Sequence, residues 1–124
     1  MQDTSVDLRP GRVRKVTIEG ITGYVIVTDR DGRPHDIFIR GFGRYGSTMQ
    51  GWADSFAMML SFYVQGGGDL PQVGHAFIEK RIEPYGTTDD PDIPHCSSMQ
   101  DYILRLLARW FELPQLRAMY ERGA

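Results

Sequence analysis

Cysteine is almost absent from this 124-residue chain, which contains only Cys96. A lone cysteine cannot form an internal disulfide, so nothing points to an oxidising compartment, and we expect a small buried side chain. The chain also lacks an apolar run of the roughly 18 to 20 residues that a membrane-spanning helix needs. Its N-terminus has no basic segment followed by an apolar one. We therefore expect a cytoplasmic protein without a membrane partner.

A strong charge of one sign is lacking too, because 14 Lys and Arg residues nearly balance 16 Asp and Glu residues, for a net charge of −2. This balance argues against the broad basic surface that duplex nucleic acid needs. A small anionic ligand needs only one or two well-placed arginines and some free backbone N–H groups. With 41% hydrophobic and 24% charged residues, the composition is that of one ordinary globular domain.

The first third of the chain is predicted to form strands. Apolar residues alternate from Val13, and β-branched and aromatic runs follow at 24–27 and 37–39. The Asp-Gly pair at 31–32 is a strong hairpin signal because glycine accepts a positive φ, and the Glu-Gly pair at 19–20 is expected to turn the first hairpin. We predict a three-stranded antiparallel meander with one face covered by helices.

Helical spacing replaces this alternation after Gly46. Ser47 and Gln50 have the spacing of a capping box at a helix start, and the glycines at 66–68 end that helix. Met58 and Phe62 fall off its main stripe, so they indicate either a second apolar face in a homo-oligomer or a helix buried on two sides. The stripe expected to face the core comprises Met49, Trp52, Ala53, Phe56, Met59, Leu60 and Tyr63.

Two further helices are predicted downstream. Asp69 caps a short one, a long irregular segment covers 81–95, and Ser97 or Ser98 begins a third helix that Pro114 interrupts. The fold class is therefore α+β, with two or three helices on one face of the meander. The expected divisions are a flexible arm at 1–11, a single domain at 12–113, and a C-terminal tail or short helix at 114–124.

The first candidate site is the glycine-rich stretch 41–46, which leads into the start of the first helix. Glycines let a backbone approach a ligand closely, and unpaired N–H groups at a helix start favour an anion. The stretch lacks the lysine and spacing of a P-loop, and the same glycines also suit a plain strand-to-helix turn. The predicted ligand contacts are Arg40, Phe42, Arg44, Tyr45, Ser47 and Thr48.

The second candidate site is the polar segment that starts at Arg81, because a loop of this length is uncommon in a small domain unless it is functional or disordered. Arg81 suits either a phosphate or a local carboxylate, and Thr87 and Thr88 offer hydroxyls. The acids at 89–92 lack the spacing of a calcium loop, and the histidines lack zinc spacing. We expect no metal, no cofactor and no catalysis by this chain alone.

The chain resembles, over about 12–111, the TSCPD-type domain at the C-terminus of adenosylcobalamin-dependent (class II) ribonucleotide reductases. The cysteine-proline stretch that names the domain is absent, since Ser97 follows Cys96, so no cysteine-based role carries over. The matching residues are Arg81, Glu83, Pro84 and Gly86, followed by Ser98, Asp101, Tyr102, Ile103, Arg105, Leu107 and Ala108.

Two functions follow from this resemblance and from the loops. We favour a non-catalytic protein that binds or sequesters a nucleotide-derived, phosphate-containing ligand, with Arg40, Arg44 and Arg81 on phosphates and Phe42 or Tyr45 stacked on a base. Its layout is similar to that of small phage proteins that sequester cyclic-nucleotide or cyclic ADP-ribose immune signals. The alternative is an accessory piece of a class II reductase, which contacts the catalytic subunit in deoxyribonucleotide synthesis.

Overall fold

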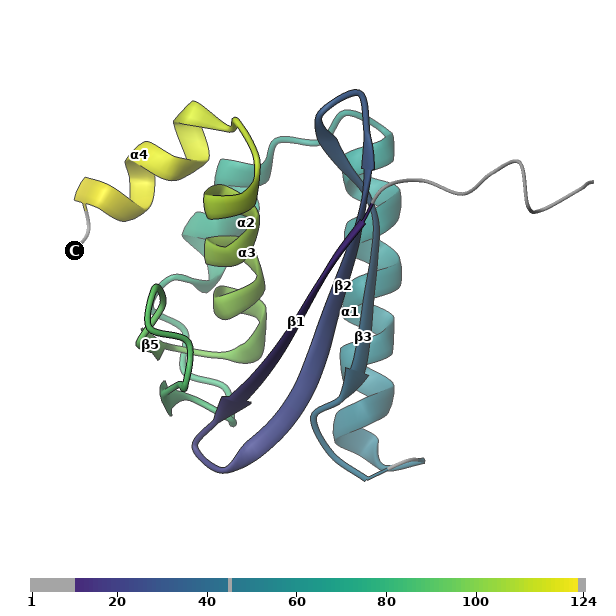
Figure 1. The fold of residues 1–124 in the computed structure, drawn as a ribbon, viewed down its shortest axis with the longest axis vertical. Helices are drawn as coiled ribbons and strands as arrows, with labels where there is room; N and C mark the ends of the chain where they lie inside the picture. Colours follow the sequence, from purple (N-terminus) through teal and green to yellow (C-terminus); the bar gives the residue numbers. More distant parts are fainter. Residues whose placement is uncertain (1–10, 45, 123–124) are drawn as a thin grey trace, which may run out of the picture.

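The predicted meander is present in the computed structural model, which describes residues 11–44 and 46–122. Strands β1 (Gly11–Ile18), β2 (Ile21–Arg30) and β3 (Arg33–Gly41) form one antiparallel sheet in the order β1-β2-β3 (Figure 1). Glu19-Gly20 and Asp31-Gly32 turn the two hairpins, with φ values of 48° and 83° and of 53° and 77°. Positive φ at both turn positions matches the twist of the strands, which confirms both predicted turns.

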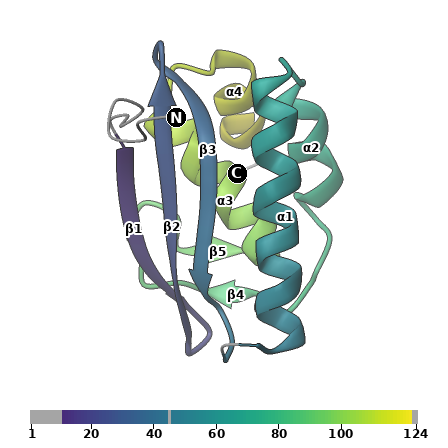
Figure 2. The same cartoon turned by 90° about the vertical axis from the view of Figure 1, so that its right-hand side faces the viewer.

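Within the described residues four helices follow the sheet, where two or three were expected. They are α1 (Thr48–Gln65), α2 (Leu70–Phe77), α3 (Met99–Trp110) and α4 (Pro114–Arg122). Helices α2, α3 and α4 lie over one face of the sheet, whereas α1 runs beside strand β3 (Figures 1 and 2). The α+β class is confirmed. In the described part of the chain, no helix combines the length and the apolar character that crossing a membrane requires.

The core lies between the inner face of the sheet and α3. The register places Val25 opposite Ile39 and Val27 opposite Ile37, and all four side chains are buried. Helix α3 is buried on most of its surface, because it faces the sheet on one side and packs against α2 and α4 on the other. Its side chains in this core are Met99, Tyr102, Ile103, Leu104, Leu106, Leu107 and Ala108.

Helix α4 belongs to the same core. Leu116 and Met119 are buried, and Arg117 Nε donates to the carbonyl of Ala108 at 3.0 Å near the C-terminal end of α3. The segment predicted as a tail or short helix therefore forms a helix through residue 122 with a buried face.

Helix α1 covers the open edge of strand β3. The Ser61 hydroxyl accepts the N–H of Ile37 at 2.8 Å and lies 3.1 Å from the Ile37 carbonyl. The Gln65 side chain donates to the carbonyl of His35 at 2.8 Å. An unpaired strand edge invites association with other strands, so these side chains satisfy backbone groups that would otherwise remain open.

The long segment between α2 and α3 is tied to the end of β1. It contains the short strands β4 (Gly86–Thr87) and β5 (His95–Cys96), which pair with each other. The backbone N–H of Thr17 donates to Asp89 Oδ1 at 2.9 Å, and the N–H of Asp89 donates to the Thr17 carbonyl at 3.1 Å. This segment therefore extends the paired structure at one end of the sheet.

Candidate functional site

The outward surface of α1 is unusually apolar for a helix at the surface. Trp52 is 70% exposed, Met59 65%, Phe62 60% and Met58 56%, and Asp54 is the only charged residue among the 18 of the helix. A helix that is apolar all round is normally buried, and contiguous exposed apolar surface marks an interaction site. This surface is therefore the candidate functional site.

The predicted core-facing stripe of this helix is partly wrong. Trp52 and Met59 were expected in the core but face outward, and the buried side of α1 consists of Ala53, Ala57, Leu60, Ser61 and Val64. The reason is that α1 packs along a strand edge, where small residues allow the close approach that the Ser61 contacts with β3 require. Large apolar residues on the remaining faces are left at the surface.

On the side of α2 and α3, two hollows among those in the described residues adjoin this apolar surface. The larger, of about 810 Å³, lies between the first turns of α1, the end of α2 and the start of α3; the smaller, of about 400 Å³, lies between α1 and α2. Phe56 and Met59 line both, so the hollows form one continuous surface. We call this surface the α1 face and define it by Trp52, Phe56, Met59, Phe62 and Tyr63.

The glycine-rich stretch has less room for a ligand than expected. Phe42 is fully buried with its ring over Gly23, where an added Cβ would lie 2.3 Å from the ring. The Phe42 ring therefore has no exposed surface on which a base could stack, contrary to the prediction. Arg44 is exposed, and Tyr45 lies outside the described residues.

The start of α1 is capped by its own side chains. Ser47 Oγ accepts the N–H of Gln50 at 3.2 Å, and Gln50 Oε1 accepts the N–H of Gly46 at 2.9 Å. Thr48 is exposed and lines the larger hollow, whereas Arg40 points from the outer sheet face and lies over the Phe38 ring at 5.7 Å. The expected capping partners are therefore in place. They pair with the backbone N–H groups of Gly46 and Gln50, which a phosphate was expected to use.

The second predicted loop is held mainly by internal contacts. Thr88 is buried, and its hydroxyl accepts the N–H of Asp90 at 3.0 Å and donates to the Ile93 carbonyl. Thr87 is exposed, and Arg81 lies over the Tyr85 ring at 5.6 Å. Ile82 and Glu83 line the larger hollow together with Thr48, but Arg40, Arg44 and Arg81 do not. The structure thus brings parts of the two predicted loops together without gathering their arginines.

Several buried polar groups of this region have structural partners, although Asp101 Oδ1 has none among the described residues. Asp101 Oδ2 accepts the N–H of Ser97 at 3.0 Å and Arg105 Nε at 2.8 Å, and the Tyr102 hydroxyl donates to Asp90 Oδ2 at 2.7 Å. Burial, and secondarily the charge of Asp101, raises the pKa of the Cys96 thiol to about 11. A thiol that stays protonated near neutral pH is a weak nucleophile. Among residues 11–44 and 46–122, no group of three or more metal-ligating side chains comes together.

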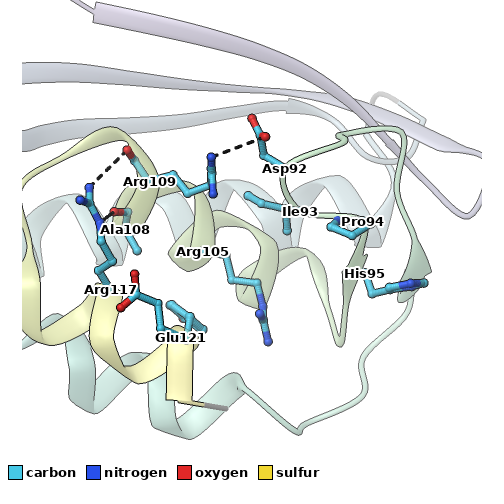
Figure 3. Close-up of a pocket in the computed structure, with 10 residues that line it drawn as sticks. Asp92, Ile93, Pro94, His95, Arg105, Ala108, Arg109, Arg117 and Glu121 are labelled. Atoms are coloured by element: carbon cyan, nitrogen blue, oxygen red, sulfur yellow. Dashed lines mark hydrogen bonds and ion pairs between the residues drawn. The ribbon is translucent and has the colours of Figure 1, made fainter. Parts of the chain in front are cut away.

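A third hollow was missed by the sequence reasoning. It has a volume of about 590 Å³ and lies between the loop at 92–95 and helices α3 and α4 (Figure 3). Arg105, Arg109 and Arg117 all line it. The available signal was the spacing of Arg105 and Arg109, four residues apart on α3 and off its apolar stripe. That spacing places them on one side of the helix but does not reveal what they face.

Comparison with known proteins gives a consistent family. The TSCPD domain family matches residues 4–111. A vitamin B12-dependent ribonucleotide reductase from Rhodopirellula baltica is 39% identical over 106 residues, which cover 85% of this chain and 10% of that protein. Proteins of the same name from Streptantibioticus cattleyicolor and Streptomyces coelicolor are 36% identical over 101 residues, or 81% of this chain. These matches cover 17% and 10% of the two proteins.

This chain therefore corresponds to about a sixth or less of the length of these curated relatives. No solved structure matches it significantly. The similarity concerns one domain, and it leaves the greater part of each relative without a counterpart in this sequence.

Proposed function

Because the chain belongs to the TSCPD domain family, we propose that it acts as a non-catalytic accessory domain of a vitamin B12-dependent ribonucleotide reductase, through contact with the catalytic part of that enzyme. The observation that carries this proposal is the α1 face. In the relatives the matching segment is part of a chain several times longer, so the larger remainder is a natural occupant for an apolar surface.

The chemistry of the α1 face suits a protein partner. Aromatic and methionine side chains are enriched at the centre of protein interfaces and charged residues are depleted there. Trp52 and Phe62 are the exposed aromatic residues of α1, and Asp54 is its only charge. Tryptophan is also among the residues that most often dominate binding energy. We therefore expect Trp52 to be the main anchor of the contact.

Binding of a nucleotide-derived ligand at the two predicted loops has weaker support. Phe42 and Thr88 are buried, and the arginines expected to share a phosphate do not line one hollow. Sequestration of such a ligand therefore remains a prediction from the sequence. The homo-oligomer predicted from Met58 and Phe62 likewise remains a prediction, which sedimentation of the isolated chain tests.

A domain exchange tests the reductase proposal. This whole chain, including the core helix α4, replaces the matching segment in the full-length Rhodopirellula baltica reductase, and ribonucleotide reduction and resistance to limited proteolysis are measured. We expect the chimera to keep reductase activity and to hold the domain docked. Trp52→Lys in the chimera is expected to release the domain, so that proteolysis at its boundary becomes roughly tenfold faster.

Val13→Lys is the matched control, because Val13 is an exposed apolar residue on β1, away from α1. It is expected to leave the cleavage rate and the activity unchanged. Equal cleavage rates in the Trp52→Lys and Val13→Lys chimeras would count against the α1 face as the docking surface. An inactive chimera whose domain is folded would count against the accessory role itself.

A further inference from the structure

We propose that the hollow between α3, α4 and the loop at 92–95 binds a phosphate-bearing small molecule of nucleotide size, with Arg105 as its main anchor. Here we call this hollow the arginine cavity (Figure 3). It lies on the side of the molecule away from α1 (Figure 1). The proposal goes beyond the reductase contact and does not depend on it.

Arg105 is held in one orientation before any ligand arrives. Its Nε donates to Asp101 Oδ2 at 2.8 Å, and its guanidinium lies 4.6 Å from the centre of the Tyr120 ring. Its two terminal amino groups have no hydrogen-bond partner among the described residues, and the side chain reaches toward the open space between the loop and α4 (Figure 3). A fixed guanidinium with an open edge can bind two phosphate oxygens at once.

This preorganisation reduces the cost of binding. A flexible arginine loses rotamer freedom when it binds an anion, and that loss weakens the complex. Asp101 is fully buried and Tyr120 is partly buried, so Arg105 is ordered already in the folded chain. Asp101 accepts a hydrogen bond only from Nε of Arg105. The opposite edge of the guanidinium is therefore left for the ligand.

The remaining charges of the arginine cavity favour an anion. Three arginines line it, against the two carboxylates of Asp92 and Glu121. Arg109 pairs with Asp92 at 3.5 Å, and both side chains are 53% exposed. An exposed pair of this kind contributes little energy, so Arg109 can turn to a phosphate at small cost. Arg117 stays bound to the carbonyls of Ala108 and Phe111 and adds positive potential at longer range.

The cavity is too large and too apolar on one wall for inorganic phosphate alone. Its volume of about 590 Å³ lies within the usual range for small-molecule sites. Ile93, Pro94 and Ala108 form an apolar wall beside the arginines. A ligand that joins a phosphate group to a flat or apolar body fits this combination, and a nucleotide has both parts.

The test is a calorimetric titration and thermal shift of the full chain with ADP, pyrophosphate and adenosine. We expect ADP to bind and to raise the unfolding temperature, pyrophosphate to bind more weakly, and adenosine not to bind, because the phosphates provide the anchor. Arg105→Lys keeps a charge near Asp101 but loses the two-point contact, so ADP affinity is expected to fall about tenfold. Arg109→Gln is expected to weaken ADP several-fold without changing stability.

Arg44→Gln and Arg81→Gln are the matched controls, because they remove arginines that do not line the cavity. They are expected to leave ADP affinity unchanged. Loss of binding in Arg44→Gln but not in Arg109→Gln would move the ligand to the glycine-rich stretch and overturn the assignment. No binding of ADP or pyrophosphate at concentrations of about 1 mM would overturn the proposal as a whole.

Discussion

At the residue scale, the polar side chains of the 81–101 region act mainly inside the structure. Tyr102 and Asp90 are buried together, and Arg14 lies 3.9 Å from the same Asp90 oxygen. Ser98 Oγ caps α3 by accepting the N–H of Asp101 at 2.9 Å. Residues that carry the family resemblance therefore anchor a loop to a helix, which explains their presence without a catalytic role.

Cys96 provides a prediction at this scale. Its pKa of about 11, against an ordinary value of 9.0, means that folding favours the protonated thiol. At pH 8 the thiolate fraction is then about a hundredfold lower than in the unfolded chain. We expect a thiol reagent such as DTNB to react with the folded protein at least tenfold more slowly than with the protein in guanidinium chloride.

The pH dependence has a defined sign. Folding raises the pKa of the Cys96 thiol. The contribution of this protonated thiol to the free energy of unfolding is therefore fully present below pH 9 and declines as the pH rises toward 11. The labelling rate of the folded protein should therefore increase steadily from pH 8 to pH 10. Rapid labelling at pH 8, equal to that of the unfolded chain, would contradict the burial of this thiol.

At the scale of elements, the relation between α1 and β3 decides which surface the protein exposes. The helix approaches the strand edge with Ala57 and Ser61, and its large apolar residues Trp52, Met58, Met59 and Phe62 remain outside. The same contact closes one edge of the sheet against association with other strands. The candidate interaction site and the protection of the sheet thus have one structural cause.

Ser61 gives the prediction for this contact. Ser61→Ala removes the acceptor of the Ile37 N–H at a buried position, and an unsatisfied buried donor costs roughly 1–3 kcal/mol. We expect the free energy of unfolding in a urea titration to fall by about that amount. Ser55→Ala, on the exposed side of the same helix, is the control and should change it by less than about 0.5 kcal/mol.

If Ser61→Ala and Ser55→Ala have the same stability, the edge contact does not hold α1 in place. A second measurement shows directly whether the contact between Ser61 and the Ile37 amide protects the strand edge. Hydrogen exchange of the Ile37 amide should accelerate in Ser61→Ala and remain unchanged in Ser55→Ala.

At the scale of the whole molecule, the chain forms one core that runs from the sheet through α3 to α4. Leu116 is 1% exposed, and its helix α4 packs against both α2 and α3. The last helix therefore stabilises the domain, and it also forms one wall of the arginine cavity. Folding and the proposed ligand site are linked through this element.

Leu116→Ala tests the contribution of α4 to the core. Truncation of a buried leucine costs roughly 2–5 kcal/mol, because it removes apolar burial and leaves a cavity. We expect a clear drop in the urea midpoint, whereas Met59→Ala on the exposed α1 face should cause little change. A stability equal to that of the wild type in Leu116→Ala would mean that α4 contributes little to the core.

Local sequence signals were enough to predict the three strands of the meander, the two hairpin turns and the starts of α1 and α3, whereas the short strands β4 and β5 were not predicted. Glu19-Gly20 and Asp31-Gly32 act through backbone preferences of their own residues, and Ser47 acts on groups within one turn. Alternation and helical spacing also identified the α+β class. These features depend on neighbours within a few positions, so the sequence alone determines them.

Only the tertiary structure decided which surfaces are available. Helical spacing shows that Trp52 and Met59 share a side of α1, but the packing of that helix on a strand edge turns the side outward. Burial of Phe42 depends on the space that Gly23 leaves on a neighbouring strand. The gathering of arginines from α3 and α4 depends on how these two helices, joined by residues 111–113, pack together. Contacts between distant segments determine each of these outcomes, and no local preference encodes them.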